Sequence, residues 1–136
     1  MNIAYLWVAL GGALGSVTRY WMGGFIAAIF PGPAATFPLG TLIINVSGSF
    51  LIGIFAALTV PEGRMDPQSR VFASQLVMTG ICGGYTTFSS FSLQTLNLLR
   101  DGEYLYAGGN ILLSVVLCLV AVWLGFLLGN VFNPVK

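Results

Sequence analysis

Neutral polar side chains recur at helical spacing in two apolar segments of the chain. They follow one another at intervals of four residues: Thr41, Asn45 and Ser49, then Asn110, Ser114 and Cys118. Residues at this spacing share one face of a helix, and an amide or hydroxyl that faces lipid is costly. Both faces should therefore contact protein or water. Hydrogen bonds between packed helices would explain them, and so would a path lined by hydrogen-bond donors.

A third segment, Gly80 to Ser92, is a poor helix former because it combines glycines with hydroxyl and β-branched residues. The sequence predicts a helix break at Gly83-Gly84, in the middle of a long apolar run. Irregular backbone at membrane depth is tolerated where it is buried in protein or lines a cavity. Its free carbonyls can coordinate a cation without any carboxylate.

Two phenylalanines, Phe88 and Phe91, follow the predicted break and lie one helical turn apart on the same face. An aromatic ring has a negative face and a positive edge, so an anion should meet such rings at their edges. Phenylalanines in a membrane helix also pack in the core or face lipid. The break immediately before these two favours the interaction with an anion.

The composition excludes a soluble enzyme, a nucleic-acid-binding protein and a disordered protein. Only 7% of the 136 residues are charged and 57% are hydrophobic, whereas an ordinary soluble domain carries about 25% charged residues. A net charge of +1 offers no basic surface for nucleic acid. His is absent, and Cys82 and Cys118 lie far apart inside apolar runs. Without a nucleophile–base pair, a carboxylate pair or a metal cluster, an enzyme is not expected.

Membrane helices must position these residues. A helix that crosses the hydrocarbon layer needs about 20 apolar residues. The apolar runs predict an all-α integral membrane protein with one domain, 1–136, and four transmembrane helices, of which the third is broken at mid-membrane. Prolines such as Pro33 and Pro61 and a charged turn separate the predicted spans, which are 3–30, 38–60, 68–100 and 103–132.

Pairs of glycines predict close helix packing in two of these spans. Gly11 and Gly15 in the first span and Gly125 and Gly129 in the fourth have the GxxxG spacing. This spacing lets helix backbones approach one another closely. The contacts could form within one chain or between two.

Positive residues are almost balanced between the two predicted sides of the membrane. Arg64, Arg70 and Lys136 lie on one side. Arg100 lies on the other, together with Arg19 if that residue is near the interface. Orientation follows the asymmetry of Lys and Arg between short loops, and three against two is almost no asymmetry. The chain could still insert one way only. Insertion in both orientations would instead favour an antiparallel homodimer with a two-fold axis in the membrane plane.

These segments resemble the Fluc (CrcB) family of fluoride channels. Gly83 to Ser92 resembles the family's broken third helix and its phenylalanine pair. Gly40 to Asn45 resembles the second-helix motif, and Gly11 to Gly15 with Arg19-Tyr20 resembles the first-helix motif. The resemblance extends over all four predicted spans, in order.

The resemblance implies a passive, multi-pass channel in the bacterial inner membrane that lets fluoride leave the cytoplasm. It also implies a dual-topology antiparallel homodimer with two pores. The side chains that it places along the fluoride path are Phe88, Phe91, Asn45, Ser114, Thr87, Ser90 and Asn110. The carbonyls of Gly83 and Thr86 would hold a structural sodium ion at the dimer centre. Asn110 and Cys118 stand where the resemblance implies an aromatic hydroxyl and a second serine.

A neutral donor set suits fluoride, which is small and strongly hydrated. Amide and hydroxyl groups can replace its water without holding the ion as tightly as Lys or Arg would, and conduction requires release as well as binding. A small multidrug or cation exporter is the main alternative. It requires a membrane carboxylate, and no Asp or Glu lies in the core of a predicted span. A structural membrane subunit, whose polar faces only join partners, is a further alternative.

Overall fold

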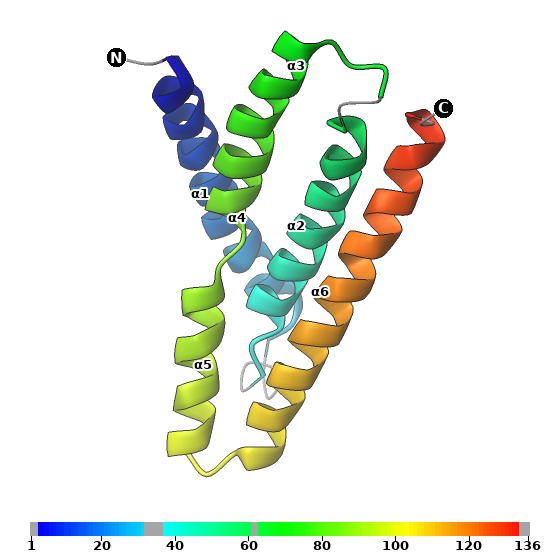
Figure 1. The fold of residues 1–136 in the computed structure, drawn as a ribbon. Helices are drawn as coiled ribbons and strands as arrows, with labels where there is room; N and C mark the ends of the chain where they lie inside the picture. The colour runs from blue at the N-terminus through cyan, green and yellow to red at the C-terminus, as the bar shows by residue number, and fades with distance from the viewer. Residues whose placement is uncertain (1–2, 32–36, 61–62, 134–136) are drawn as a thin grey trace.

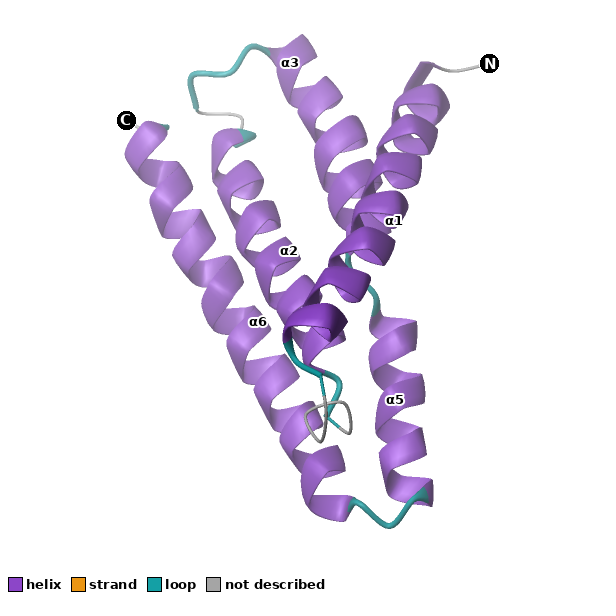
Figure 2. Cartoon of the chain, turned by 180° about the vertical axis from the view of Figure 1, so that it is seen from behind, coloured by secondary structure: helices purple, strands orange, loops and turns teal. Residues whose placement is uncertain are grey.

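A computed structural model describes residues 3–31, 37–60 and 63–133 of the chain. Pro33, Pro61 and Lys136, which the sequence analysis used, lie outside these residues. The helices, in chain order, are α1 (Ile3–Ile29), α2 (Leu39–Leu58), α3 (Pro67–Phe72), the π-helix η2 (Ala73–Cys82), α4 (Gly83–Tyr85), α5 (Phe88–Arg100) and α6 (Tyr104–Phe132) (Figure 1). No strand occurs in the described ranges (Figure 2), which confirms the prediction of an all-α fold.

The helices run beside one another along the length of the molecule. α2 packs along α6, and α1 packs against η2 and α4. The helices α3, η2, α4 and α5 follow one another as a single interrupted segment, 67–100. The start of α1, the end of α6 and the loop before α3 lie at one end of the molecule, and the turn between α5 and α6 lies at the other (Figures 1 and 2).

The exposed surface is that of a protein surrounded by lipid. α2 and α6 are long and apolar enough to cross a membrane, judged by length and composition. Large apolar side chains are exposed along the whole of α6, from Leu105 to Val131. Exposed apolar surface on this scale marks a membrane or partner surface. The fold is therefore that of a helical membrane protein, and the count of four spans in one domain stays a prediction.

Glycines bring helix backbones into direct contact, as their GxxxG spacing predicted. A Cβ atom at Gly125 of α6 would overlap the carbonyl oxygen of Phe50 in α2, and one at Gly129 would lie 2.6 Å from that of Ile54. The glycine pair of α1 faces the backbone of η2 and α4 in the same way. Both pairs thus form contacts within one chain.

Replacing Gly125 by Ala is expected to lower the free energy of unfolding by about 1–3 kcal/mol, because the added methyl group overlaps backbone that cannot turn aside. Gly108→Ala is a matched control in the same helix, since a Cβ atom there meets nothing within 4 Å. The control should keep or raise stability through the better helix propensity of Ala. Thermal unfolding of the two variants in detergent checks this, and equal losses would contradict the packing role of Gly125.

Asn133 joins the end of α6 to the end of α2 and to the following loop. It is buried, its amide oxygen accepts a hydrogen bond from the Arg64 N–H at 2.6 Å, and its amide nitrogen donates to the carbonyls of Ala57 at 2.9 Å and Leu58 at 3.3 Å. The last carbonyls of a helix have no partner within the helix. Asn133 supplies these partners for α2, and nothing in the sequence pattern had singled it out.

The helix break lies at Thr86 and Thr87, not at Gly83-Gly84 as the sequence predicted. Thr86 (φ −79°, ψ 158°) and Thr87 (φ −153°, ψ 109°) are extended, whereas Gly83 is helical (φ −65°, ψ −36°). The reason is that Gly84 serves close packing of this segment against α1. A Cβ atom at Gly84 would lie 2.6 Å from the carbonyl oxygen of Gly12 in α1.

Candidate functional site

A cavity of about 470 Å³ lies where the helix break faces α2 and α6, and we call it the break cavity. Its polar and aromatic lining comprises Asn45, Ser49, Cys82, Thr86, Thr87, Phe88, Phe91, Ser114 and Cys118. Both polar helix faces and the phenylalanine pair thus reach one space. This convergence agrees with the prediction that these faces contact protein or water, although Thr41 and Asn110 do not line the break cavity.

Asn45 anchors the break. Its amide oxygen accepts a hydrogen bond from the Thr87 N–H at 2.8 Å, and its amide nitrogen donates to the Thr87 carbonyl at 3.1 Å. One side chain therefore satisfies both backbone groups of a residue that has left the helix, as buried backbone requires. Because an amide carries two N–H donors, one of them is left to bind another acceptor in the cavity.

The Thr87 side chain caps the helix that follows. Its hydroxyl oxygen accepts a hydrogen bond from the Ser90 N–H at 3.2 Å, donates to the Ser90 hydroxyl at 3.0 Å and contacts the Ser89 hydroxyl at 3.2 Å. A threonine in this position is a favourable helix N-cap. α5 therefore starts at Phe88, and both phenylalanines lie in its first turn.

The phenylalanine rings form a tilted pair at the wall of the break cavity. The ring centroids of Phe88 and Phe91 are 5.3 Å apart, and the ring planes are inclined by 46°. Phe88 is 78% exposed and Phe91 is half-buried. The Phe88 ring consequently does not belong to the packed core of the chain.

On α6, Ser114 lines the break cavity, while Asn110 lies behind the cavity wall and does not line it. Asn110 is 1% exposed. It donates from its amide nitrogen to the Thr95 hydroxyl at 2.8 Å and accepts from the Ser114 hydroxyl at 3.4 Å. For Asn110, the structure thus shows the helix-to-helix hydrogen bonds that the sequence analysis had considered.

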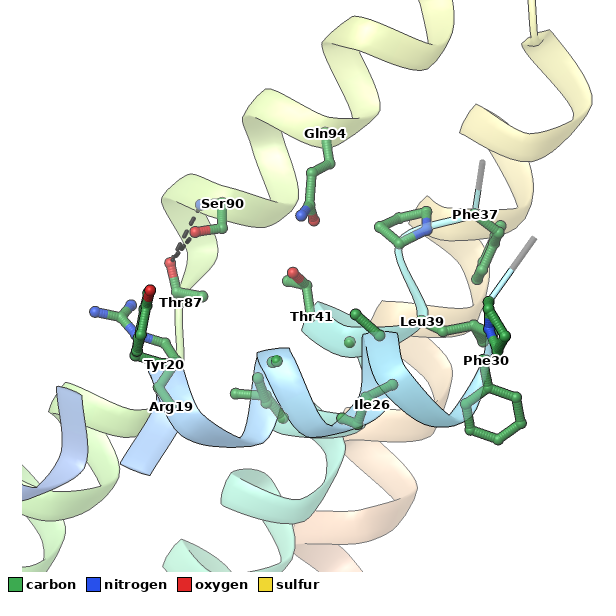
Figure 3. A pocket seen from close by; sticks show the side chains of 17 residues that line it. Arg19, Tyr20, Ile26, Phe30, Phe37, Leu39, Thr41, Thr87, Ser90 and Gln94 are labelled. Atoms are coloured by element: carbon green, nitrogen blue, oxygen red, sulfur yellow. Dashed lines mark hydrogen bonds between the residues drawn. The ribbon is translucent and has the colours of Figure 1, made fainter. Parts of the chain in front are cut away.

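A second cavity of about 500 Å³ lies between α1, α2 and α5, and we call it the Arg19 cavity (Figure 3). Thr41 and Gln94 point toward one another across it, and the buried Gln94 amide oxygen has no hydrogen-bond partner among the described residues. Arg19 is the one charged side chain of its described lining. Thr87 lines both cavities and so separates them.

Comparison with known proteins shows to which family this chain belongs. Residues 6–126 match the family described as CrcB-like protein, Camphor Resistance (CrcB). The chain belongs to the CrcB family.

Relatives of this CrcB chain carry the name Fluoride-specific ion channel FluC. The protein of Methylocella silvestris is 56% identical over 134 residues, covering 97% of each chain. That of Opitutus terrae is 58% identical over 132 residues, covering 97% of this chain and 96% of the relative. That of Rhodospirillum rubrum is 55% identical over 123 residues, covering 90% and 92%. The names describe channels and not enzymes, as the lack of catalytic groups predicted, and they agree with the resemblance.

The CrcB structure places the predicted site residues in three different surroundings. The break cavity receives Asn45, Thr87, Phe88, Phe91, Ser114, Gly83 and Thr86. Ser90 lines the Arg19 cavity, and Asn110 is buried between α5 and α6. Sequence reasoning missed Thr95 and Gln94, because a single Thr or Gln in an apolar helix carries no signal without its partners.

The break also removes the helical hydrogen-bond donors of the Gly83 and Thr86 carbonyls in this CrcB protein. In a continuous helix the Gly83 carbonyl would accept from the Thr87 N–H, and the Thr86 carbonyl from the Ser90 N–H. Asn45 binds the first of these N–H groups and the Thr87 hydroxyl binds the second. Both carbonyls are therefore released from the helical pattern, and oxygen ligands of this kind suit a hard cation such as sodium.

Proposed function

We propose that this CrcB-family protein is a passive, fluoride-selective channel that exports fluoride from the cytoplasm across a bacterial inner membrane. The observation that carries the proposal is the lining of the break cavity. There the neutral donors of Asn45 and Ser114 share one space with the rings of Phe88 and Phe91. The names of the relatives point in the same direction.

The physical chemistry of this lining suits fluoride. The second amide N–H of Asn45 and the Ser114 hydroxyl replace water molecules of a strongly hydrated ion, and the positive edges of the rings add a weaker attraction. Chloride is larger and a poorer hydrogen-bond acceptor. The same groups therefore offset a smaller part of its dehydration free energy. In the adjoining cavity Arg19, the one charged side chain of the described lining, raises the local concentration of anions beside Thr87.

The assembly that fits this proposal is an antiparallel homodimer with two pores and four spans per chain. The near balance of Lys and Arg supports it, and so does the exposed ring of Phe88, which a second copy would cover. The released carbonyls of Gly83 and Thr86, one pair from each copy, would hold one structural sodium ion at the dimer centre. That ion stays in place and stabilises the dimer while fluoride passes through the two pores.

Ion efflux from liposomes that contain only the purified protein tests the proposed function. A fluoride-selective electrode should record rapid fluoride efflux when an ionophore balances the charge, and a chloride electrode should record almost none from the same vesicles. Equal efflux of the two anions would refute fluoride selectivity.

The same vesicles distinguish the two alternatives. A small multidrug or cation exporter moves its substrate in exchange for protons that a membrane carboxylate binds and releases. The helices that the structure describes contain no Asp or Glu. Fluoride efflux that is independent of a pH gradient excludes such an exporter. A purely structural subunit would pass no ion at all.

A further inference from the structure

A buried chain of hydrogen bonds connects the wall of the break cavity to the backbone of α5. The Ser114 hydroxyl donates to the Asn110 amide oxygen at 3.4 Å, and the Asn110 amide nitrogen donates to the Thr95 hydroxyl at 2.8 Å. The Thr95 hydroxyl in turn donates to the carbonyl of Phe91 at 2.8 Å. Thr95 is 8% exposed and Asn110 is 1% exposed, so water does not substitute for the bond between them.

The direction of every hydrogen bond in this series is fixed by the Phe91 carbonyl at its end. A backbone carbonyl can only accept, and a hydroxyl has a single proton. The Thr95 hydroxyl must therefore donate its proton to the Phe91 carbonyl and accept a hydrogen bond from the Asn110 amide nitrogen. Only the NH₂ group of the amide can donate, so the amide oxygen faces Ser114. The Ser114 proton is consequently directed toward Asn110 and away from the cavity.

We propose that Thr95 is a positioning residue for the break cavity, because it fixes the orientation of the Asn110 amide and thereby gives the Ser114 hydroxyl a second acceptor. This inference rests on the proposed function. The Ser114–Asn110 bond, at 3.4 Å, is the longest of the three and hence the weakest. The Ser114 hydroxyl can turn from Asn110 to an anion in the cavity, and it turns back when the anion leaves.

Removing the Thr95 hydroxyl should disturb this exchange. Without its acceptor, the Asn110 NH₂ group is free to turn and donate to Ser114. The Ser114 proton then has no acceptor on Asn110 and stays directed into the cavity, where it binds the ion more tightly and slows its release. Conduction requires release as well as binding, so flux should fall.

Thr95→Val removes the hydroxyl and keeps the shape of the side chain, whereas Thr95→Ser keeps the hydroxyl. Thr18→Val is a matched control, since the exposed Thr18 hydroxyl likewise donates to the carbonyl four residues before it, that of Leu14, at 2.8 Å. Solution NMR gives the exchange rate of the Asn110 side-chain amide protons, and liposome efflux gives fluoride flux. In Thr95→Val we expect amide exchange at least tenfold faster and fluoride flux at least fivefold lower. Thr95→Ser and Thr18→Val should stay within twofold of the wild type in both measurements.

Each other outcome overturns part of this picture. Faster amide exchange with unchanged fluoride flux in Thr95→Val would overturn the positioning role and leave the proposed function intact. Unchanged exchange and flux, or an equal loss of flux in Thr95→Ser, would overturn it as well. Wild-type protein without fluoride flux would refute the proposed function and this inference with it. If Thr95→Val does not fold, Thr95→Cys, with its weaker donor, should give intermediate values.

Discussion

Replacing Phe88 or Phe91 by Ile is expected to lower fluoride flux by about fivefold or more while the protein stays folded. Ile keeps an apolar side chain of broadly similar bulk but removes the ring and its positive edge. A lost edge contact should cost on the order of 1 kcal/mol or more, which corresponds to about fivefold in rate. If the proposed pore is narrow and dry, no water replaces the contact.

The position of the two rings sharpens this test. Because Phe88 is 78% exposed within the chain, Phe88→Ile removes little packing there, and a loss of flux at that position cannot be assigned to a damaged core. Phe25→Ile is the control, since Phe25 also belongs to a ring pair, with Trp21 at 5.5 Å, but lines neither cavity. Thermal unfolding and fluoride efflux should be measured on all three variants. Near-normal flux in both Phe88→Ile and Phe91→Ile would mean that the rings only pack.

Replacing Asn45 by Ala is expected to reduce both stability and fluoride flux. The change leaves the N–H and the carbonyl of Thr87 without partners, which should lower the free energy of unfolding by about 2–3 kcal/mol. Flux should fall at least tenfold, because the break loses its anchor and the cavity loses a donor. Thermal unfolding and liposome efflux measure the two effects separately.

Ser49→Ala is the matched control for Asn45→Ala. Ser49 lies one helical turn further along α2 and lines the same cavity, but it is not part of the anchor at Thr87. The control should retain wild-type stability. Loss of flux in Asn45→Ala with fully retained stability would show that Asn45 acts only as a donor to the ion, and the anchoring role would then be wrong.

The features of this structure that could be predicted are those that local sequence patterns determine. The helical fold, the close backbone packing at Gly125, and the orientation of Asn45 and Ser114 away from lipid all follow from spacing within a helix. Periodicity gives the face on which a residue lies. It does not give the partner that the face meets, so it could not tell that Asn110 bonds to Thr95 while Ser114 lines the cavity.

The location of the break shows why propensity alone was insufficient. Low helix propensity placed it at Gly83-Gly84, but those residues keep helical backbone because α1 leaves no room for a side chain beside Gly84. The chain leaves the helix where Asn45, 42 residues earlier, offers a donor and an acceptor to Thr87. A contact between residues so distant in sequence is not visible in any local window.

The hydrogen bonds of Asn133 to the end of α2 and to the loop before α3 can form only late in biosynthesis. Asn133 is added 76 residues after Ala57 and 69 residues after Arg64, the residues whose backbone it binds. Until α5 and α6 have been made, the carbonyls at the end of α2 therefore lack this donor, and the Arg64 N–H lacks this acceptor. The end of the molecule that holds the α2 terminus and the loop before α3 closes late, after the ribosome has delivered the helices that pack beside it.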